Sequence, residues 1–324
     1  MDTIKALCRS LAGRRINRTL WFKGRSLSIW LVVSLFSLLV ISCDSPPKES
    51  YAPTYTSSLD VKQAVLTFGV HPLHNPQRLF AIYGPLIEYL NQECPELTIQ
   101  LEASRSYEEF EKKLYSRHFH FALPNPYQTI QAMSHGYHVF AKMGEDEKFR
   151  GIILVRKDSG INTVADLKGK TVSFPAPTAL AATMMPLEYL HTHGLDVNHD
   201  ITRLFSGSQE SSIMNVILGK SAAGATWPPP WQAFIEANPA IADELEVRWE
   251  TSSLINNSLV VRDDVPPEVV SRIKSILLAL HTHEKGCKLL ALLPLACFED
   301  GNDATYQPVQ DFMKEYGKSI HDIQ

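Results

Sequence analysis

The chain has 324 residues, of which 44% are hydrophobic and 20% charged, and its formal net charge is −4. This composition is typical of a globular protein and excludes a disordered or fibrous chain. The length exceeds what one hydrophobic core usually serves, so we expect two domains of ordinary size. No segment resembles a P-loop or a GxGxxG turn, which excludes the common nucleotide-binding classes.

The first 42 residues have the pattern of a secretory leader. Residues 1–28 carry seven Lys and Arg against the single acid Asp2, and an apolar run without charges follows as far as Ser42. That run is too short for a comfortable membrane span. It ends in VIS before Cys43, which resembles a bacterial lipobox. The resemblance implies a signal peptide over 1–42, cleavage before Cys43 and lipidation of its thiol; the alternative is a plain N-terminal anchor.

Without this leader the chain is clearly acidic. It keeps 24 Lys and Arg against 34 Asp and Glu, a formal charge of −10. A domain this acidic is a poor partner for nucleic acid, and we predict none. Three cysteines remain besides Cys43, and an odd number excludes a full disulfide framework. A Cys287–Cys297 bridge stays open, with small buried side chains as the favoured alternative.

Residues 43–63 are predicted to be a flexible tether, because they are rich in Pro, Ser and Thr and lack apolar periodicity. A first unit of alternating strands and helices follows. Its helices cover 78–90, where apolar residues recur every three or four positions, and a segment that starts at a capping box of Ser106 and Glu109. Its predicted strands are 65–70, 98–102, 119–123, 137–143 and 151–156.

A second unit begins near Ser159. Thr163 starts a short helix that Gly169 ends, and Ser208 caps a longer one. The loop PAPTALAATMMP, residues 175–186, leads from a strand into another helix. The predicted strands are 171–174, 222–226, 244–251 and 258–261, and a long helical stretch over 266–293 follows them.

Strands that alternate with helices favour parallel sheets covered on both faces. We expect the chain to cross between the units near 151–156 and again near 258–261. Lobe 1 would then comprise 64–155 and 258–324, and lobe 2 would comprise 156–257. A ligand would bind between the lobes, at the carboxyl ends of strands and the N-termini of helices.

Several stretches, taken in order, resemble the substrate-binding proteins of phosphate, phosphite and phosphonate ABC transporters. They extend from about residue 64 to 316 and read LTFGVHP, PLIEYL, ASRSYEEF, FHFALPNPY, FRGIILVRKDSGINTVADLKGKTVSF, PAPTALAATMMPLEYL, SGSQESSIMNVILGK and CFEDGNDATYQPVQDF. The resemblance implies a two-lobed periplasmic-binding-protein fold of the type II kind, in the α/β class. Its cleft between the lobes closes on a ligand by hinge motion.

The resemblance also assigns residues to the ligand site. The family's ligand-contacting aromatics match Tyr107 and Phe149, and its Ser-Thr-Ser-Gly helix start falls on residues 179–182, Ala-Leu-Ala-Ala. Gln209 takes the place of a His. The backbone N–H donors of the helix start remain, but its hydroxyls are gone, and a dianion needs such donors. We therefore expect an altered anion pocket and a different small ligand.

Two of the family's acidic positions are also changed, because they fall on Ala222 and near Asn257. The stretch TWPPPWQAF offers Trp227 and Trp231 as a replacement wall that stacks against a planar or apolar part of the ligand. The alternative is that Trp227 packs in the core and Trp231 lies at the start of a Pro-rich helix. His71, His74 and Asn75 also face the expected cleft, with a loop surface as the alternative.

These observations give a set of expected ligand contacts. Backbone donors come from the helix start, amide donors from Gln209 and Asn257, and ring contacts from Tyr107, Phe149 and Trp227. The complete set is Tyr107, Asn125, Tyr127, Phe149, Thr178, Ala179, Leu180, Ala181, Ser208, Gln209, Trp227 and Asn257.

Neither a metal nor a cofactor nor a catalytic group is predicted. The pair His118 and His120 has no acidic or Cys partner spaced nearby, and the other close histidine pairs point apart on helices. The Ser206-Gly207-Ser208 segment lacks the strand-to-helix elbow of a nucleophilic serine. We therefore expect a binding protein and not an enzyme.

The sequence thus predicts an extracytoplasmic, monomeric solute-binding lipoprotein that delivers a small oxyanion-like or modified ligand to the permease of an ABC importer. Asp44 after Cys43 resembles the signal that retains lipoproteins at the inner membrane. This implies a location at the periplasmic face of the inner membrane, or at the outer face of the cytoplasmic membrane if the organism has no outer membrane. The alternative function is a ligand-sensing input protein for a membrane signalling receptor.

Overall fold

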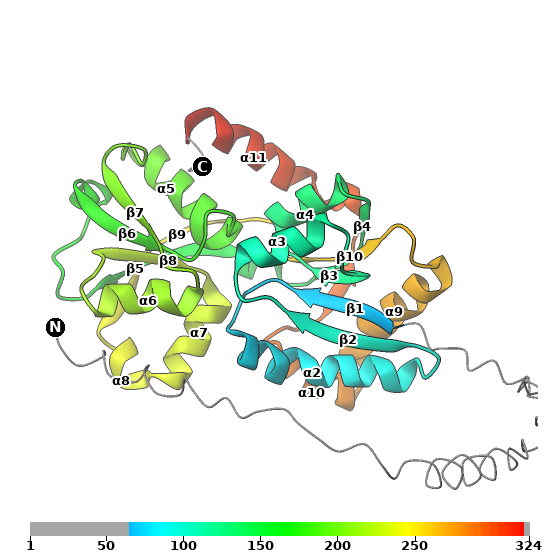
Figure 1. Ribbon diagram of the computed structural model, residues 1–324. Coiled ribbons are helices and arrows are strands. Elements are labelled where there is room, and N and C mark those ends of the chain that lie inside the picture. The colour runs from blue at the N-terminus through cyan, green and yellow to red at the C-terminus, as the bar shows by residue number, and fades with distance from the viewer. Residues whose placement is uncertain (1–64, 321–324) are drawn as a thin grey trace, which may run out of the picture. The chain divides into compact units, whose positions relative to one another are not determined.

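The computed structural model describes residues 65–320, and two β-sheets organise them (Figure 1). The two sheets with their helices confirm the predicted α/β fold with two lobes. The predicted signal peptide, the lipidated Cys43 and the tether lie outside the described residues.

The first sheet has the strand order β11-β4-β10-β3-β1-β2. Its strands are β1 (Val65–Val70), β2 (Thr98–Ala103), β3 (Phe121–Leu123), β4 (Tyr137–Met143), β10 (Ser258–Arg262) and β11 (Phe298–Asp300). β1 runs parallel to β2 and β3, whereas β10 runs antiparallel to β3 and β4. The prediction of a parallel sheet was wrong, because β10 returns from the second lobe and enters this sheet against its neighbours.

The second sheet has the order β7-β6-β8-β5-β9 and is also mixed. β6 runs parallel to β7 and β8, and β5 runs antiparallel to β8 and β9. Its strands are β5 (Arg150–Arg156), β6 (Lys170–Phe174), β7 (Ile201–Phe205), β8 (Ala223–Thr226) and β9 (Leu245–Ser253). Because β5 lies in this sheet, sheet membership divides the chain near residue 149, whereas the predicted boundary follows residue 155. No strand was predicted at β7.

Four of the helices described here begin at a polar side chain that caps them. Asn75, Ser106, Asn125 and Ser208 each accept a hydrogen bond from the backbone N–H three residues on. The α-helices are α2 (Pro76–Glu93), α3 (Tyr107–Tyr115), α4 (Pro126–Met133), α5 (Met185–Thr192), α6 (Gln209–Ile217), α7 (Pro228–Ala237), α8 (Pro239–Ala242), α9 (Pro267–Ala279), α10 (Glu284–Leu292) and α11 (Gln307–Ser319).

Two helical predictions differ from the structure. Only half of the predicted capping box forms, because the Glu109 carboxylate accepts from the backbone N–H of Arg105 rather than Ser106. The predicted continuous stretch over 266–293 is interrupted between α9 and α10. There His283 caps α10 by accepting from the N–H of Gly286 at 3.0 Å.

The three described cysteines are free thiols, so no Cys287–Cys297 bridge forms here. Cys94 is buried, as the favoured alternative expected, but Cys287 is exposed. None of the helices between residues 65 and 320 combines the length and the apolar character needed to cross a bilayer.

Two segments, 144–149 and 254–257, carry the chain between the sheets and are hydrogen-bonded to each other. Asn256 donates from Nδ2 to the carbonyl of Gly144 at 2.8 Å, and its backbone N–H donates to Asp146 at 2.9 Å. Asp146 also pairs with the buried Lys142 at 2.9 Å, and Lys142 pairs with Glu299 at 2.6 Å. We call Lys142, Asp146, Asn256 and Glu299 the crossing network; it ties both connections to the first lobe.

Candidate functional site

Side chains and backbone from both lobes enclose a small space, which we call the inner cavity. Its room for the centres of water-sized spheres is about 10 Å³, which suits about one water molecule. The residues that line it are His71, Tyr107, Asn125, Phe149, Ala179, Leu180, Ala181, Ala182, Gln209, Trp227 and Asn257. Nine of the twelve expected contact residues are therefore brought together; that they bind a ligand stays a prediction.

The start of the helix after β6 supplies backbone donors to the inner cavity. A short π-helical turn over Leu180–Met184 leads directly into α5. The N–H groups of residues 180–182 precede any intrahelical acceptor, and none of the three makes a hydrogen bond with another described residue. Gly151 of β5 allows this approach, because a Cβ there would lie 2.4 Å from the carbonyl oxygen of Ala181.

A chain of three side chains spans the cavity. Thr226 donates from its hydroxyl to Oε1 of Gln209 at 2.8 Å, and Gln209 donates from Nε2 to the hydroxyl oxygen of Tyr107 at 3.2 Å. Burial raises the pKa of Tyr107, so this phenol keeps its proton. Since the Tyr107 oxygen already accepts, its own O–H remains available as a donor.

Asn257 lines the cavity, and the unpaired end of its side chain is an acceptor, while the donor role expected from the sequence stays a prediction. Its side chain is fully buried, and Nδ2 points to the sulfur of Met143 at 3.6 Å. The carbonyl oxygen Oδ1 is buried without a hydrogen-bond partner. A buried acceptor without a donor is unfavourable by about 1–3 kcal/mol, so this atom is a place where a ligand donor would be stabilising.

His71 is a second acceptor that lines the inner cavity. Its Nδ1 donates to the carbonyl oxygen of Leu123 at 2.9 Å, because a carbonyl can only accept. Burial lowers the pKa of His71 to about 4, and the hydrogen bond to Leu123 offsets this only in part. The ring is therefore neutral at pH 7, with a lone pair on Nε2.

A latch closes the two lobes beside the cavity. Asn125 donates from Nδ2 to the carbonyl oxygen of Thr178 at 2.9 Å, and the Thr178 hydroxyl donates to Glu111. Gln128 also donates to Glu111, at 3.0 Å. Thr178 thus joins the lobes but does not line the cavity, which differs from the expected ligand contact.

Tyr127 and Ser208 likewise do not line the inner cavity. Tyr127 is half-buried and packs against the hydrophobic core. The Ser208 hydroxyl caps α6 and donates to the hydroxyl of Ser211 at 2.9 Å. Tyr127 follows the predicted strand 119–123 but packs in the core, and Ser208 is the helix cap that the sequence predicted.

Phe149 and Trp227 form an aromatic wall, with ring centroids 5.5 Å apart. Trp227 is only 4% exposed, so it is both a core residue and a cavity residue. Trp231 instead stacks on Phe234 within lobe 2. The structure therefore agrees with the second alternative, a core Trp227 and a Trp231 at the start of a Pro-rich helix, while stacking of Trp227 on a ligand stays a prediction.

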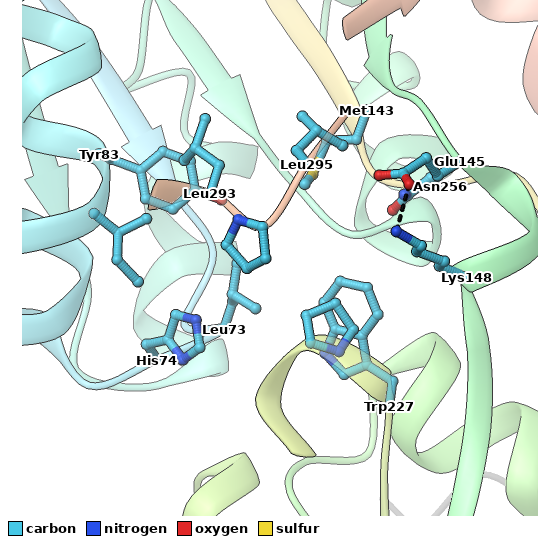
Figure 2. A pocket seen from close by; sticks show the side chains of 13 residues that line it. Leu73, His74, Tyr83, Met143, Glu145, Lys148, Trp227, Asn256, Leu293 and Leu295 are labelled. Atoms are coloured by element: carbon cyan, nitrogen blue, oxygen red, sulfur yellow. Dashed lines mark hydrogen bonds and ion pairs between the residues drawn. The ribbon is translucent and has the colours of Figure 1, made fainter. Parts of the chain in front are cut away.

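A second space, which we call the outer groove, is also lined by Trp227 (Figure 2). It has room of about 20 Å³ for the centres of water-sized spheres. His74 lines it, whereas Asn75 is an exposed helix cap. Its full lining is Leu73, His74, Ile82, Tyr83, Met143, Glu145, Lys148, Trp227, Pro229, Asn256, Leu293, Pro294 and Leu295.

No group of three His, Cys, Asp or Glu side chains between residues 65 and 320 could hold a metal ion. One detail of the histidine analysis was wrong. His118 does have an acidic partner, because its Nε2 lies 2.7 Å from Oε2 of Glu102 on β2. The two residues are neighbours in space because the segment before β3 that carries His118 is hydrogen-bonded to Thr67 of β1, and β2 pairs with β1.

Comparison with known proteins places this architecture in a family. The profile of the family described as "ABC transporter, phosphonate, periplasmic substrate-binding protein" matches residues 68–306. The chain belongs to this family. The description is that of a solute-binding protein and not of an enzyme, as the sequence predicted.

Two curated relatives of this phosphonate-type binding protein match parts of the chain. A probable ABC transporter phosphite-binding protein of Prochlorococcus marinus is 23% identical over 193 residues, 56% of this chain and 65% of that protein. A tetrathionate sensor histidine kinase of Salmonella typhimurium is 26% identical over 154 residues, 45% of this chain. The chain spans 65% and 26% of the lengths of these two proteins.

The fold comparison agrees with the family. A solved structure from Prochlorococcus marinus, in complex with methylphosphonate, superposes with a TM-score of 0.72 at 19% identity. The match covers 78% of this chain and 98% of that one. At this identity the likeness establishes the periplasmic-binding-protein fold of this phosphonate-type protein and leaves its ligand open.

Proposed function

We propose that this protein is the extracytoplasmic solute-binding lipoprotein of an ABC importer, and that its ligand differs from a simple phosphate dianion. Family membership supports the general role. The observation that carries the ligand proposal is the inner cavity, which is lined by lobe 2 residues with unpaired backbone donors and by Asn257, whose Oδ1 is an unpaired acceptor.

The hydrogen-bonding groups of the inner cavity favour a ligand with both acceptors and a donor. The helix start and the Tyr107 hydroxyl would donate to ligand oxygens, while Asn257 and His71 would accept from a ligand O–H or N–H. No charged side chain lines this space. A desolvated dianion would lack charged donors here, so a singly ionised oxyanion that keeps one proton, or a neutral polar group, fits better.

The anchoring and partners follow from the sequence. Lipidation of Cys43 would hold the monomeric protein at the periplasmic face of the inner membrane, with residues 43–63 as the tether. The closed lobes would then present the loaded protein to the permease. The phosphite-binding relative supports phosphorus oxyanions as the first class to test.

Calorimetric titration with phosphite, methylphosphonate and phosphate would test this proposal. We expect binding to weaken at least tenfold as each compound passes from its monoanion to its dianion with rising pH, because the second charge finds no charged donor. Asn257→Ala should weaken the protonated form and leave the deprotonated form little changed. If no oxyanion, phosphonate or small polar metabolite raises the melting temperature, the solute-binding proposal is wrong.

A second candidate function is ligand sensing for a membrane receptor, and the match to part of a tetrathionate sensor kinase favours it. The same closed form would then be read by a receptor instead of a permease. Neighbouring genes discriminate the two, since permease and ATPase genes favour transport and a kinase gene favours sensing. Loaded protein that stimulates the ATPase activity of the reconstituted transporter would exclude a purely sensory role.

A further inference from the structure

The inner cavity and the outer groove share one lining side chain. Trp227 is the residue that lines both spaces. The two are also neighbours at a second point, because Asn257 of the inner cavity donates to the sulfur of Met143, which lines the outer groove. A ligand that passes the edge of the indole would therefore extend from one space into the other.

The two spaces have opposite chemical character. The inner cavity offers unpaired donors and acceptors, whereas most of the outer groove is lined by aliphatic and aromatic side chains. Figure 2 shows Leu73, Tyr83 and Leu293 on the side of lobe 1, with Trp227 opposite them. Ile82 of α2 and Pro229 of α7 add apolar surface from the two lobes.

The charged residues of the outer groove leave no free charge for a ligand. Lys148 and Glu145 pair with each other, and Glu145 also accepts from the backbone N–H of Ala296 at 2.9 Å. Burial, with a contribution from the cation of Arg78, lowers the pKa of His74 to about 3, so its ring is neutral. A charged second group on the ligand would have no partner here, but an apolar one would be desolvated against similar surface.

From this arrangement we infer that the ligand is amphipathic, with a small polar head in the inner cavity and an apolar chain or ring that passes Trp227 into the outer groove. The inference rests on the proposed function, since it names the substrate class of that same site. The inner cavity has room for about one water in the closed form, so the lobes would open to admit the head. Substituents larger than a methyl group need the second space.

A homologous series of alkylphosphonates tests this inference, with methyl-, ethyl-, butyl- and hexylphosphonate titrated at a pH where each keeps one proton. We expect the affinity to rise about fourfold for each methylene that leaves water, until the groove is filled. Equal or falling affinity along the series, while methylphosphonate binds, would overturn the amphipathic ligand and leave the proposed function standing. If no member binds, this inference and the phosphorus-oxyanion ligand fail together.

Matched variants locate the chain-length effect in the groove. Pro229→Asp places a carboxylate in the outer groove at a helix N-terminus, where an acid is tolerated, and Pro228→Asp is its control outside the groove. We expect Pro229→Asp to lower hexylphosphonate affinity at least tenfold more than methylphosphonate affinity. Pro228→Asp should keep the gain in affinity per methylene that the wild type shows. An equal gain in affinity per methylene in the two variants would overturn the inference that the apolar chain lies in the outer groove.

A second pair probes the opposite wall from lobe 1. Ile82 lines the groove on α2, whereas Phe80 of the same helix is 50% exposed and lies outside it. Ile82→Asp should reduce the gain per methylene, and Phe80→Asp should not. Because the two pairs lie on different lobes, a folding defect in one variant leaves the other pair decisive; melting temperatures identify such a defect.

Discussion

Asn256 and Asn257 are adjacent and both buried, yet their surroundings differ in a way that separates structure from function. The Asn256 side chain donates to Gly144 and accepts from the N–H of Asn257 at 2.8 Å, and its backbone carbonyl accepts from the Tyr306 hydroxyl. The carbonyl oxygen of the Asn257 side chain has no partner. The fully paired Asn256 holds segments 144–149 and 254–257 together. The unpaired oxygen of Asn257 is stabilised only when a ligand donates a hydrogen bond to it.

The largest effect expected from this comparison is on stability at Asn256. Asn256→Ala leaves the carbonyl of Gly144 and the buried N–H of Asn257 without their partners. We expect the free energy of unfolding to fall by about 2–4 kcal/mol, measured by reversible urea unfolding. Asn257→Ala is the matched control and should change it by less than about 1 kcal/mol. Equal losses in the two variants would contradict the distinction drawn here.

His71 is an intermediate case, with one ring nitrogen paired and the other free, and it gives a pH-dependent test. Its pKa is lowered to about 4 in the folded protein, so on acidification the unfolded chain binds the proton first. Its contribution to stability is therefore intact above about pH 6.5 and lost as the pH falls towards 4.

His71→Asn should keep the donor to Leu123, because its amide nitrogen takes the place of Nδ1, and should remove this titration. Between pH 7 and pH 4, we expect the variant to lose about 3 kcal/mol less unfolding free energy than the wild type. Urea unfolding at both pH values measures the difference. Burial lowers the pKa of His74 in both proteins, and the smaller effect of His71 on that pKa is removed together with His71, so the difference reports the titration of His71 and its coupling to His74. Parallel losses would show that His71 is not protected from protonation.

Ligand affinity provides the converse test at Asn257. If its oxygen accepts from the ligand, Asn257→Ala should weaken the tightest-binding phosphonate about tenfold, since a hydrogen bond to a buried group is lost. The measurement is calorimetric titration beside Asn302→Ala, a helix cap at Asp303–Tyr306 that does not line the cavity. An unchanged affinity for Asn257→Ala would mean that the ligand leaves this oxygen unpaired.

The smallest expected effect is at Tyr107, which already has one partner. Tyr107→Phe removes the acceptor of the Gln209 amide and a free donor to the cavity. We expect a loss of about 1 kcal/mol in unfolding free energy and a loss of about threefold to tenfold in affinity. Thermal melts and titration of the same phosphonate measure the two. A loss of stability without loss of affinity would confine the hydroxyl to a structural role.

Local patterns predicted much of this fold because they act over a few residues. Caps at Ser106 and Ser208 and apolar spacing in α2 marked the helices, and ordered motifs brought most of the cavity residues together. Strand β7 was missed in a short segment, ITRLF, that mixes apolar and polar residues without a clear turn signal. The direction of β10 depends on a return from the other lobe, which no local pattern encodes.

The site was less predictable because its chemistry depends on contacts distant in sequence. Met143 accepts from the amide nitrogen of Asn257, whose oxygen stays unpaired, and the Leu123 carbonyl places the proton of His71 on Nδ1. Glu111, which accepts the hydrogen bond of the Thr178 hydroxyl in the latch, lies 67 residues away in the sequence. Residue types could be placed near the cleft, but their roles as donor or acceptor required the fold.

The position of Trp227 also gives the protein an optical property. Beyond residue 42 the sequence has three tryptophans; of these, Trp231 stacks on Phe234 and Trp249 lies half-buried on β9. Only Trp227 lines the inner cavity and the outer groove. The fluorescence of an indole depends on the polarity around the ring. Binding of a ligand in either space would therefore change the fluorescence of Trp227, while that of Trp231 and Trp249 would stay constant. The unlabelled protein would thus act as its own fluorescent indicator of occupancy.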